Sequence, residues 1–237
     1  MFKRFLYIIL ILLIIGCGVG LRFIGNYPIE SVFIEGELSL PERSLLQEKI
    51  RKDFKAGIFD VDLFDKINTI GKHFNWVYSI EVRRDWPNSL VLKVEKILPV
   101  AKWNNGKYLS SQAKVIDSVL DYDDLPGFNV TSSSPIKSMQ VYRDLAGKLQ
   151  HNNLNIVELT EDAYGEWSVI MSNGLVVRLG SDGLSRSLRR SILAYSGLAP
   201  KVRSNIEYID ARYSGGVVLK VLSDSEMPNY FGFVVND

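Results

Sequence analysis

The sequence predicts an α+β fold that follows a single N-terminal membrane helix. Three observations predict it: an uncharged apolar run near the start, a β-α-α-β-β pattern after that run, and a second half dominated by alternating strand patterns with two helices. We expect a cytoplasmic stub at residues 1–4, a transmembrane helix at 5–24, an α+β domain at 27–97 and a mostly antiparallel β domain at 98–237.

The composition is that of a folded protein with two differently charged parts. Hydrophobic residues make up 46% of the 237 residues and charged residues 23%, which excludes wholesale disorder. The 28 basic and 27 acidic residues nearly cancel, which argues against a nucleic-acid binder that works through a strongly basic surface. Residues 1–22 carry +3 and the remainder −2, so we expect the two parts to face different surroundings.

The apolar run over residues 5–21 has 17 residues without a charge. A helix of that length spans roughly 25 Å, and it reaches the ~30 Å of a hydrocarbon core if Arg22 extends to the interface and the helix continues to Ile24. Lys3 and Arg4 precede the run, so the positive-inside rule places the N-terminus in the cytoplasm and exports the remainder.

Two other interpretations of the same run stay open. It has the length of a cleaved signal peptide, although an Ala-x-Ala-like cleavage site is missing. The run from Ile14 to Cys17 also resembles a bacterial lipobox, in which the cysteine is lipidated. All three interpretations export the body of the chain. Since Cys17 is the single cysteine, we expect no disulfide, thiolate nucleophile or cysteine metal site in that body.

The first exported domain is predicted from alternation and helical spacing. Its first helix begins with a capping box of Ser39 and Glu42, and Pro41 is tolerated in the first turn. Apolar residues then recur at helical spacing in both helices, and alternation marks the strands. The predicted elements are a strand at 29–35, a helix from Ser39 to near Gly57, a helix from Asp60–Asp62 to Phe74, and strands at 78–83 and 90–95.

The second domain is richer in predicted strands. An Asn-Gly pair at 105–106 indicates a tight hairpin, and Ser214-Gly215-Gly216 indicates another near the end. Residues 121–135 are the most loop-like stretch. The predicted strands are 101–103, 107–109, 115–116, 155–160, 166–171, 175–179, 206–213 and 217–222, the predicted helices are 136–150 and 184–196, and 231–235 is a candidate edge strand.

Residues 75–103 contain a tryptophan–proline hairpin followed by a Pro-x-Ala-x-Trp run. Placed after an apolar N-terminal run and a β-α-α-β-β pattern, they resemble the POTRA domain and the start of the β domain of the FtsQ/DivIB family of cell-division proteins. Residues 208–213 resemble the late Tyr-x-Asp-x-Arg-Tyr strand of that family. We interpret the matching motif residues as structural: Trp76, Arg84, Trp86, Pro87, Pro99 and Trp103.

The late hairpin is the best candidate for binding a partner. An edge strand offers unpaired backbone groups to a partner's strand, and small residues allow close approach. The resemblance implies that FtsB docks here by strand addition, with FtsL bound through it. From the residues alone, an ordinary hairpin whose arginine pairs internally fits as well. The candidate contact residues are Tyr208, Arg212, Tyr213, Ser214, Gly215 and Gly216.

The sequence does not indicate an enzyme. Its two histidines, His73 and His151, lie at predicted helix ends, and no metal-ligand spacing, P-loop or nucleophile elbow is present. We expect no catalytic residue, cofactor, metal or nucleic acid. The resemblance implies a type II, single-pass inner-membrane scaffold at the septum that links early and late divisome components and affects septal peptidoglycan synthesis indirectly. The alternative is a periplasmic POTRA-bearing lipoprotein or a chaperone or transport-associated binding protein.

Overall fold

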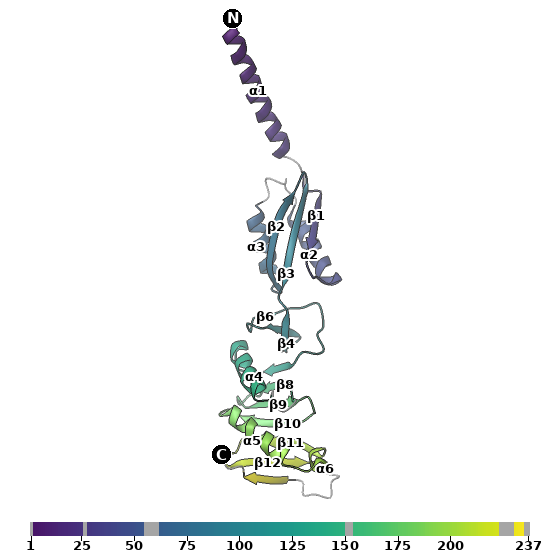
Figure 1. Cartoon of the computed structure of the whole chain (residues 1–237), viewed down its shortest axis with the longest axis vertical. Helices are drawn as coiled ribbons and strands as arrows, with labels where there is room; N and C mark the ends of the chain where they lie inside the picture. Colours follow the sequence, from purple (N-terminus) through teal and green to yellow (C-terminus); the bar gives the residue numbers. More distant parts are fainter. Residues whose placement is uncertain (1, 26–27, 55–61, 150–153, 223–229, 235–237) are drawn as a thin grey trace. The chain divides into compact units, whose positions relative to one another are not determined.

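The computed structural model describes residues 2–25, 28–54, 62–149, 154–222 and 230–234. The chain divides into two compact units, Met1–Ile97 and Leu98–Asp237, which are considered separately (Figure 1). Some predicted features lie outside the described residues: the helix end near Gly57, the helix start at Asp60, the residues from Gln150 to His151, and Val235.

The N-terminal run forms one helix, α1 (Phe2–Gly25). Each of its large apolar side chains that the structure describes is exposed, from Tyr7 to Val19. No helix in the described part of the chain has both the length and the hydropathy of a membrane span. The span expected at residues 5–24 is therefore not confirmed.

The rest of the first unit has the predicted β-α-α-β-β order. Its three strands form a sheet in the order β1-β3-β2, in which β1 runs parallel to β3 and β2 runs antiparallel to it. Buried apolar residues of both helices, including Leu46 and Ile70, share the core with Leu90 and Leu92 of β3. The elements are β1 (Ser31–Glu35), α2 (Leu40–Asp53), α3 (Leu63–His73), β2 (Val77–Asp85) and β3 (Ser89–Lys96).

The predicted capping box at the start of α2 is confirmed. The Ser39 N–H donates to Glu42 Oε2 at 2.7 Å, and the Glu42 N–H donates to Ser39 Oγ at 3.3 Å. Lys96 Nζ lies 3.1 Å from the same carboxylate. Burial alone would raise the pKa of Glu42, but the hydrogen bonds from Ser39 and Lys96 outweigh it and hold that pKa below 4.5. The cap thus also ties α2 to the end of β3.

Gly36 marks a close approach of two backbone segments in this unit. Its φ is +135°, and a Cβ at this position would lie 2.2 Å from the carbonyl oxygen of Val94. A residue with a side chain cannot take this position without moving the chain, so the turn after β1 requires glycine.

The second unit is built on one ten-stranded sheet in the order β13-β12-β11-β10-β9-β8-β7-β4-β5-β6. The pairs β4–β7, β7–β8 and β10–β11 are parallel and the others antiparallel, so the prediction of a mostly antiparallel domain is confirmed. Figure 1 shows the labelled strands from β8 to β12 following one another in chain order. The strands are β4 (Pro99–Trp103), β5 (Lys107–Ser110), β6 (Val115–Ile116), β7 (Gly127–Val130), β8 (Ile156–Glu161), β9 (Trp167–Met171), β10 (Val176–Gly180), β11 (Ile206–Asp210), β12 (Gly216–Val221) and β13 (Tyr230–Val234).

Two long helices cover one face of this sheet. They are α4 (Pro135–Leu149) and α5 (Leu184–Ser196); α5 packs against β10, β12 and α4. Fully buried side chains such as Phe128, Leu159 and Trp167 fill the core beneath them. A short third helix, α6 (Pro200–Arg203), was not expected because four residues are too few to show a helical period.

A buried carboxylate fixes the chain before α4. Glu161 accepts hydrogen bonds from the backbone N–H groups of Ser132 and Ser133, at 2.9 Å and 2.7 Å, and from the Ser133 hydroxyl. Burial would raise the pKa of Glu161, but these bonds hold it below 4.5. Ser134 Oγ then accepts the N–H of Lys137 in the first turn of the helix.

Two sequence-based assignments were wrong, and a third was confirmed. Residues 127–130 form strand β7 inside the stretch predicted as a loop, because both of its neighbours, β4 and β8, supply parallel pairing from distant segments. The strand expected at 206–213 ends at Asp210, where the chain turns. The candidate edge strand at 231–235 is present as β13.

The family-motif residues lie in different environments. Trp76 is buried, and Trp103 packs against the core of the second unit. Trp86 is 57% exposed, so it does not lie in a core, and its interpretation as a structural residue stays a prediction. Pro99 opens β4, and the remaining two, Arg84 and Pro87, are exposed near the β2–β3 turn.

Candidate partner-binding edge

The six candidate contact residues lie on the last hairpin of the ten-stranded sheet. Tyr208 is within β11, Gly216 is the first residue of β12, and the other four form the connection between the strands. The hairpin pairs in antiparallel register, with Ile209 opposite Leu219. Both of these side chains are fully buried, so one face of the hairpin belongs to the core.

The expected open edge on β12 is not open. β13 pairs with β12 in antiparallel register over five residue pairs, from Gly216 opposite Val234 to Lys220 opposite Tyr230. β11 is likewise paired on both sides, with β10 and β12. The outermost strand at this end is therefore β13, and the edge prediction was wrong in placing a free strand edge on the hairpin itself.

Arg212 pairs within the chain, as the alternative interpretation of the sequence allowed. Its Nη2 lies 2.7 Å from Asp210 Oδ2, and its Nη1 lies 2.8 Å from Glu166 Oε2. Burial would raise the pKa of Asp210, but the hydrogen bonds from Arg212 outweigh it and hold that pKa below 3.8. The same bonds to Asp210 and Glu166 raise the pKa of Arg212.

Glycine at the end of β10 makes room for this arginine. Gly180 has a φ of +88°, and a Cβ there would lie 3.4 Å from Arg212 Cγ. Arg212 therefore lies against the end of β10. Its ion pairs join Asp210 at the end of β11 to Glu166, the residue before β9, in one charged cluster.

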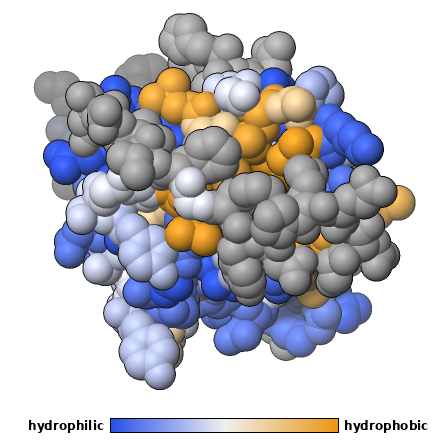
Figure 2. All heavy atoms as spheres, turned by 90° about the horizontal axis from the view of Figure 1, so that it is seen from below, coloured by the Kyte–Doolittle hydropathy of each residue, from blue (hydrophilic) through white to orange (hydrophobic). Residues whose placement is uncertain are grey.

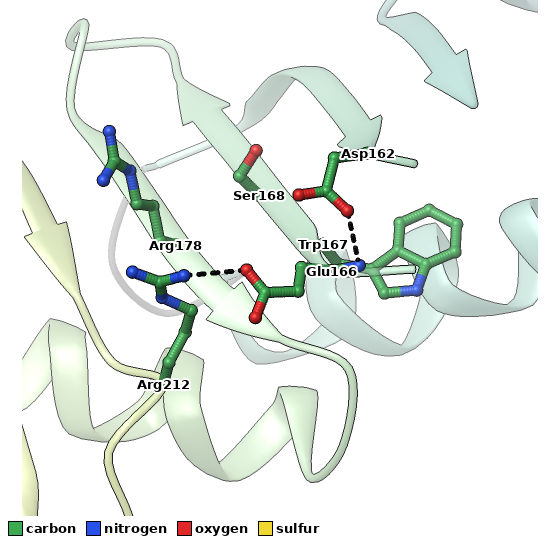
Figure 3. Close-up of a pocket in the computed structure, with 6 residues that line it drawn as sticks. All are labelled: Asp162, Glu166, Trp167, Ser168, Arg178 and Arg212. Carbon is green, nitrogen blue, oxygen red and sulfur yellow. Dashed lines mark hydrogen bonds and ion pairs between the residues drawn. The ribbon is translucent and has the colours of Figure 1, made fainter. Parts of the chain in front are cut away.

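This cluster borders a shallow cavity of about 280 Å³. Figure 3 shows Arg212 and Glu166 pointing toward each other, with Arg178 on the adjacent strand. The Arg178 guanidinium lies 4.0 Å from the centroid of the Tyr208 ring, so Tyr208 is held by a cation–π contact. The cavity is lined by Asp162, Glu166, Trp167, Ser168, Arg178 and Arg212.

A buried arginine holds the same hairpin from inside. Arg190 of α5 is 4% exposed; it donates to the backbone carbonyl of Ser214 at 2.5 Å and to that of Ala211 at 3.1 Å. This role of Arg190 was not predicted, because the sequence pattern at 184–196 indicated a helix but not the contacts of its individual side chains. A usable signal was present: Ser187, Ser191 and Ala194, at helical spacing around Arg190, are small enough to leave its side chain room toward the core.

Between these two anchors, the tip of the hairpin faces solvent. Tyr213 is 56% exposed, Ser214 and Gly215 are also exposed, and a Cβ at Gly215 would meet no atom within 4 Å. Leu222, just past β12, is 49% exposed. Figure 2 shows the molecule from below the view of Figure 1, with hydrophobic residues gathered between hydrophilic ones on this face.

The described residues do not show a metal centre. They contain no group of three or more His, Cys, Asp or Glu side chains placed to hold a metal ion. His73 ends α3 and stacks edge-on against Phe74, with 4.7 Å between the ring centroids.

Two family profiles match the chain and together cover most of it. "POTRA domain, FtsQ-type" matches residues 27–96, and "Cell division protein FtsQ/DivIB, C-terminal" matches residues 101–212. The chain belongs to the FtsQ/DivIB family. This membership assigns it to bacterial cell division, in a family of scaffold proteins that is not a known enzyme family.

Similar FtsQ proteins span nearly the whole chain. Cell division protein FtsQ of Neisseria meningitidis serogroup B is 24% identical over 222 residues, which cover 93% of this chain and 94% of that protein. FtsQ of Cellvibrio japonicus is 27% identical over 202 residues, 84% of this chain and 62% of that protein. FtsQ of Allochromatium vinosum is 29% identical over 226 residues, 90% of this chain and 86% of that protein.

The C-terminal FtsQ/DivIB profile ends at Arg212. Among the candidate contact residues, Tyr208 and Arg212 therefore lie inside the matched region, and Tyr213 to Gly216 lie beyond it. Strands β12 and β13 also lie beyond it.

Proposed function

We propose that this chain is a divisome scaffold that binds FtsB, and FtsL through it, at the late hairpin of its ten-stranded sheet. One observation carries the proposal: the β11–β12 connection is fixed on both sides while its tip stays exposed. Arg190 holds the backbone of Ala211 and Ser214 from the core, and Arg212 is tied to Asp210 and Glu166 on the other side. A preorganised backbone lowers the entropy cost of binding.

Tyr213 is the proposed anchor of this contact. It is 56% exposed, and tyrosine is among the residue types enriched at binding hot spots. Arg212 has a different role in the proposal, because its guanidinium already serves the hairpin. In the proposal, Arg212 positions Tyr213, and the contact between the partner and the exposed part of the Arg212 side chain is of lesser importance.

The proposal also includes the location and organisation of the chain. Residues 5–24 anchor it in the inner membrane as a type II protein, after a cytoplasmic stub at 1–4, with the POTRA domain at 27–97 and the β domain at 98–237 in the periplasm. The uncharged run at 5–21 and the exposed apolar side chains of α1 support the anchor. Control of septal peptidoglycan synthesis is then indirect, through the bound partners.

The central test is binding of the full-length chain to the periplasmic part of FtsB from the same organism. We expect Tyr213→Ala to weaken binding by roughly 30-fold or more, as for a hot-spot residue. Tyr78→Ala is the matched control, since Tyr78 is a similarly exposed tyrosine on β2. Equal binding by wild type and Tyr213→Ala contradicts the proposed site. If FtsB binds neither the wild type nor the variant Gly232→Pro described below, the proposed partner is wrong.

The anchor has its own test. Mass measurement of the mature N-terminus distinguishes an intact Met1 end from a diacylated Cys17 or a cleaved chain. An intact N-terminus in the membrane fraction supports the type II anchor, and a lipidated Cys17 supports the lipoprotein alternative instead.

A further inference from the structure

β13 lies in the place that a partner's strand would need. β12 has two sides, and β11 occupies one of them. Among the described strands, β13 pairs with β12 alone and occupies the other side. The opposite residues in this antiparallel pair are Gly216 and Val234, Val217 and Phe233, Val218 and Gly232, Leu219 and Phe231, and Lys220 and Tyr230.

The geometry separates two ways in which a partner's strand can be added. A strand added outside β13 lies about 4.8 Å beyond β13, and hence about 9.6 Å from β12. A strand that replaces β13 in the same antiparallel register lies directly beside β12, and its C-terminal end lies next to Gly216, the residue that follows the exposed hairpin tip. Contact with Tyr213 and with the backbone of β12 therefore favours replacement.

We infer that β13 is an intramolecular occupant of the β12 edge, which FtsB displaces when it binds. This inference rests on the proposed function and adds its regulation: the chain closes its own docking edge until a partner's strand competes successfully. An edge strand paired on one side belongs to the part of a fold that opens most readily, so the exchange does not require the remaining sheet to unfold.

β13 also indicates the chemistry of the partner's strand. Its residues opposite Val217 and Leu219 are both phenylalanine, and glycine stands opposite Val218. Val217 and Leu219 are fully buried on the core side of β12. A competing strand therefore runs antiparallel to β12 and carries large apolar or aromatic residues at two alternate positions, with a small residue between them.

Displacement has a measurable cost in affinity. When only the open form binds, the apparent affinity falls by the fraction of molecules that are open. Minor conformations are typically populated at 0.1–10%, so closure by β13 weakens apparent binding roughly ten- to thousandfold. A change that holds β13 off β12 should therefore raise the apparent affinity by about that factor, and a change that holds β13 on β12 should remove the form that binds.

A disulfide across the two strands tests the inference in the full-length protein. Val218→Cys and Gly232→Cys, in a Cys17→Ser background, place two cysteines at opposite residues of the pair. We expect the oxidised protein to bind the periplasmic part of FtsB at least about tenfold more weakly than wild type, with full recovery on reduction. Glu81→Cys with Lys93→Cys is the control pair, because it joins opposite residues of β2 and β3 in the other unit.

A second variant changes the affinity in the opposite direction. Gly232→Pro removes a backbone N–H from β13 and disfavours its pairing, so we expect binding at least about tenfold tighter than wild type. Failure of the lock to form on oxidation, or unchanged FtsB binding by the oxidised lock, overturns displacement. Equal affinity of Gly232→Pro and wild type for FtsB also overturns displacement. If neither wild type nor Gly232→Pro binds FtsB, the proposed function itself fails.

Discussion

The two ends of the ten-stranded sheet are built differently. The early end finishes in β6, which has two residues. Side-chain hydrogen bonds hold the strands near it: the Asn104 amide bonds to the backbone of Val130, and the Tyr108 hydroxyl donates to the exposed Asp121 carboxylate at 2.9 Å. The late end finishes in the five-residue β13, and charged side chains hold the hairpin beside it, Arg190 from inside and Arg212 from outside.

The difference agrees with the proposal that a partner's strand exchanges at the late end. A two-residue edge offers too little backbone to align another chain, and short edges are a common protection against unwanted pairing. At the late end, β12 pairs with its outer neighbour over five residue pairs, next to the exposed tip of the β11–β12 hairpin. We therefore expect substitutions at the early end to change stability alone, and substitutions at the late end to change stability and partner binding together.

The largest effect on stability is expected for Arg190→Met. Methionine retains much of the volume but leaves the carbonyls of Ala211 and Ser214 without their donor, which should lower the free energy of unfolding by about 3 kcal/mol. FtsB binding should weaken as well. Urea unfolding and a binding titration check both effects. Arg186→Met, at an exposed position on the same helix, is the control; equal losses in the two variants would contradict the anchoring role.

Asn104→Ala tests the early end. The Asn104 amide donates to Val130 O at 2.5 Å and accepts the Val130 N–H at 2.8 Å, so its removal should lower the free energy of unfolding by about 2 kcal/mol. FtsB binding should stay as in wild type. Asn129→Ala, an exposed asparagine on β7, is expected to cost less than about 0.5 kcal/mol. Loss of FtsB binding in Asn104→Ala would show that the two ends are not independent.

Acid should weaken the late end through Asp210. Because its folded-state pKa lies below 3.8, the carboxylate contributes stability that is complete above that value and is lost as the pH falls through the lower folded-state pKa. Asp210→Asn should therefore be less stable than wild type at pH 7 by about 1 kcal/mol. Its deficit should shrink as the pH falls below 3.8.

Asp121→Asn is the control for this pH series at the early end. The pKa of Asp121 is also lowered, chiefly by the hydrogen bond from Tyr108, but its side chain is 75% exposed and solvent screens its interactions. Unfolding followed from pH 7 to pH 3 separates the two variants. A constant deficit of Asp210→Asn over that range would contradict the assignment.

The smallest effect on stability belongs to Tyr213→Ala. The side chain is exposed, so we expect the free energy of unfolding to change by less than about 0.5 kcal/mol while FtsB binding weakens strongly. At the early end, Tyr108→Phe removes one hydrogen bond and should cost about 1 kcal/mol without changing binding. Thermal unfolding of both variants beside the binding titration tests this contrast.

Local patterns predicted much of the fold. The capping box at Ser39, the helical spacing of α2 and α3, and the strand alternation before and after Trp86 are properties of neighbouring residues, so the sequence contains them directly. β7 was missed because it is four residues long and is stabilised by parallel pairing with two distant strands. No local pattern encodes such pairing.

The candidate site was predictable in part for the same reason. Tyr208 to Gly216 are close in sequence, so their proximity needed no knowledge of the fold. The partners of the site are distant: Arg190 is 24 residues from Ser214, and Glu166 is 46 residues from Arg212. The assumption of an open edge was wrong since β13, a short segment recognised only as a candidate edge strand, pairs with β12.

The strand order of the sheet has a consequence for biogenesis. From β8 to β13, each strand pairs with the one that precedes it in the chain, so this part of the sheet can assemble as the chain emerges, from the N-terminal side onward. β13 follows every other strand and arrives last. During that interval β12 has an unpaired edge. If FtsB is the partner as proposed, an FtsB strand already present can pair with this edge without displacing β13. Co-synthesis of the two proteins would then assemble the complex faster than mixing of the finished chains.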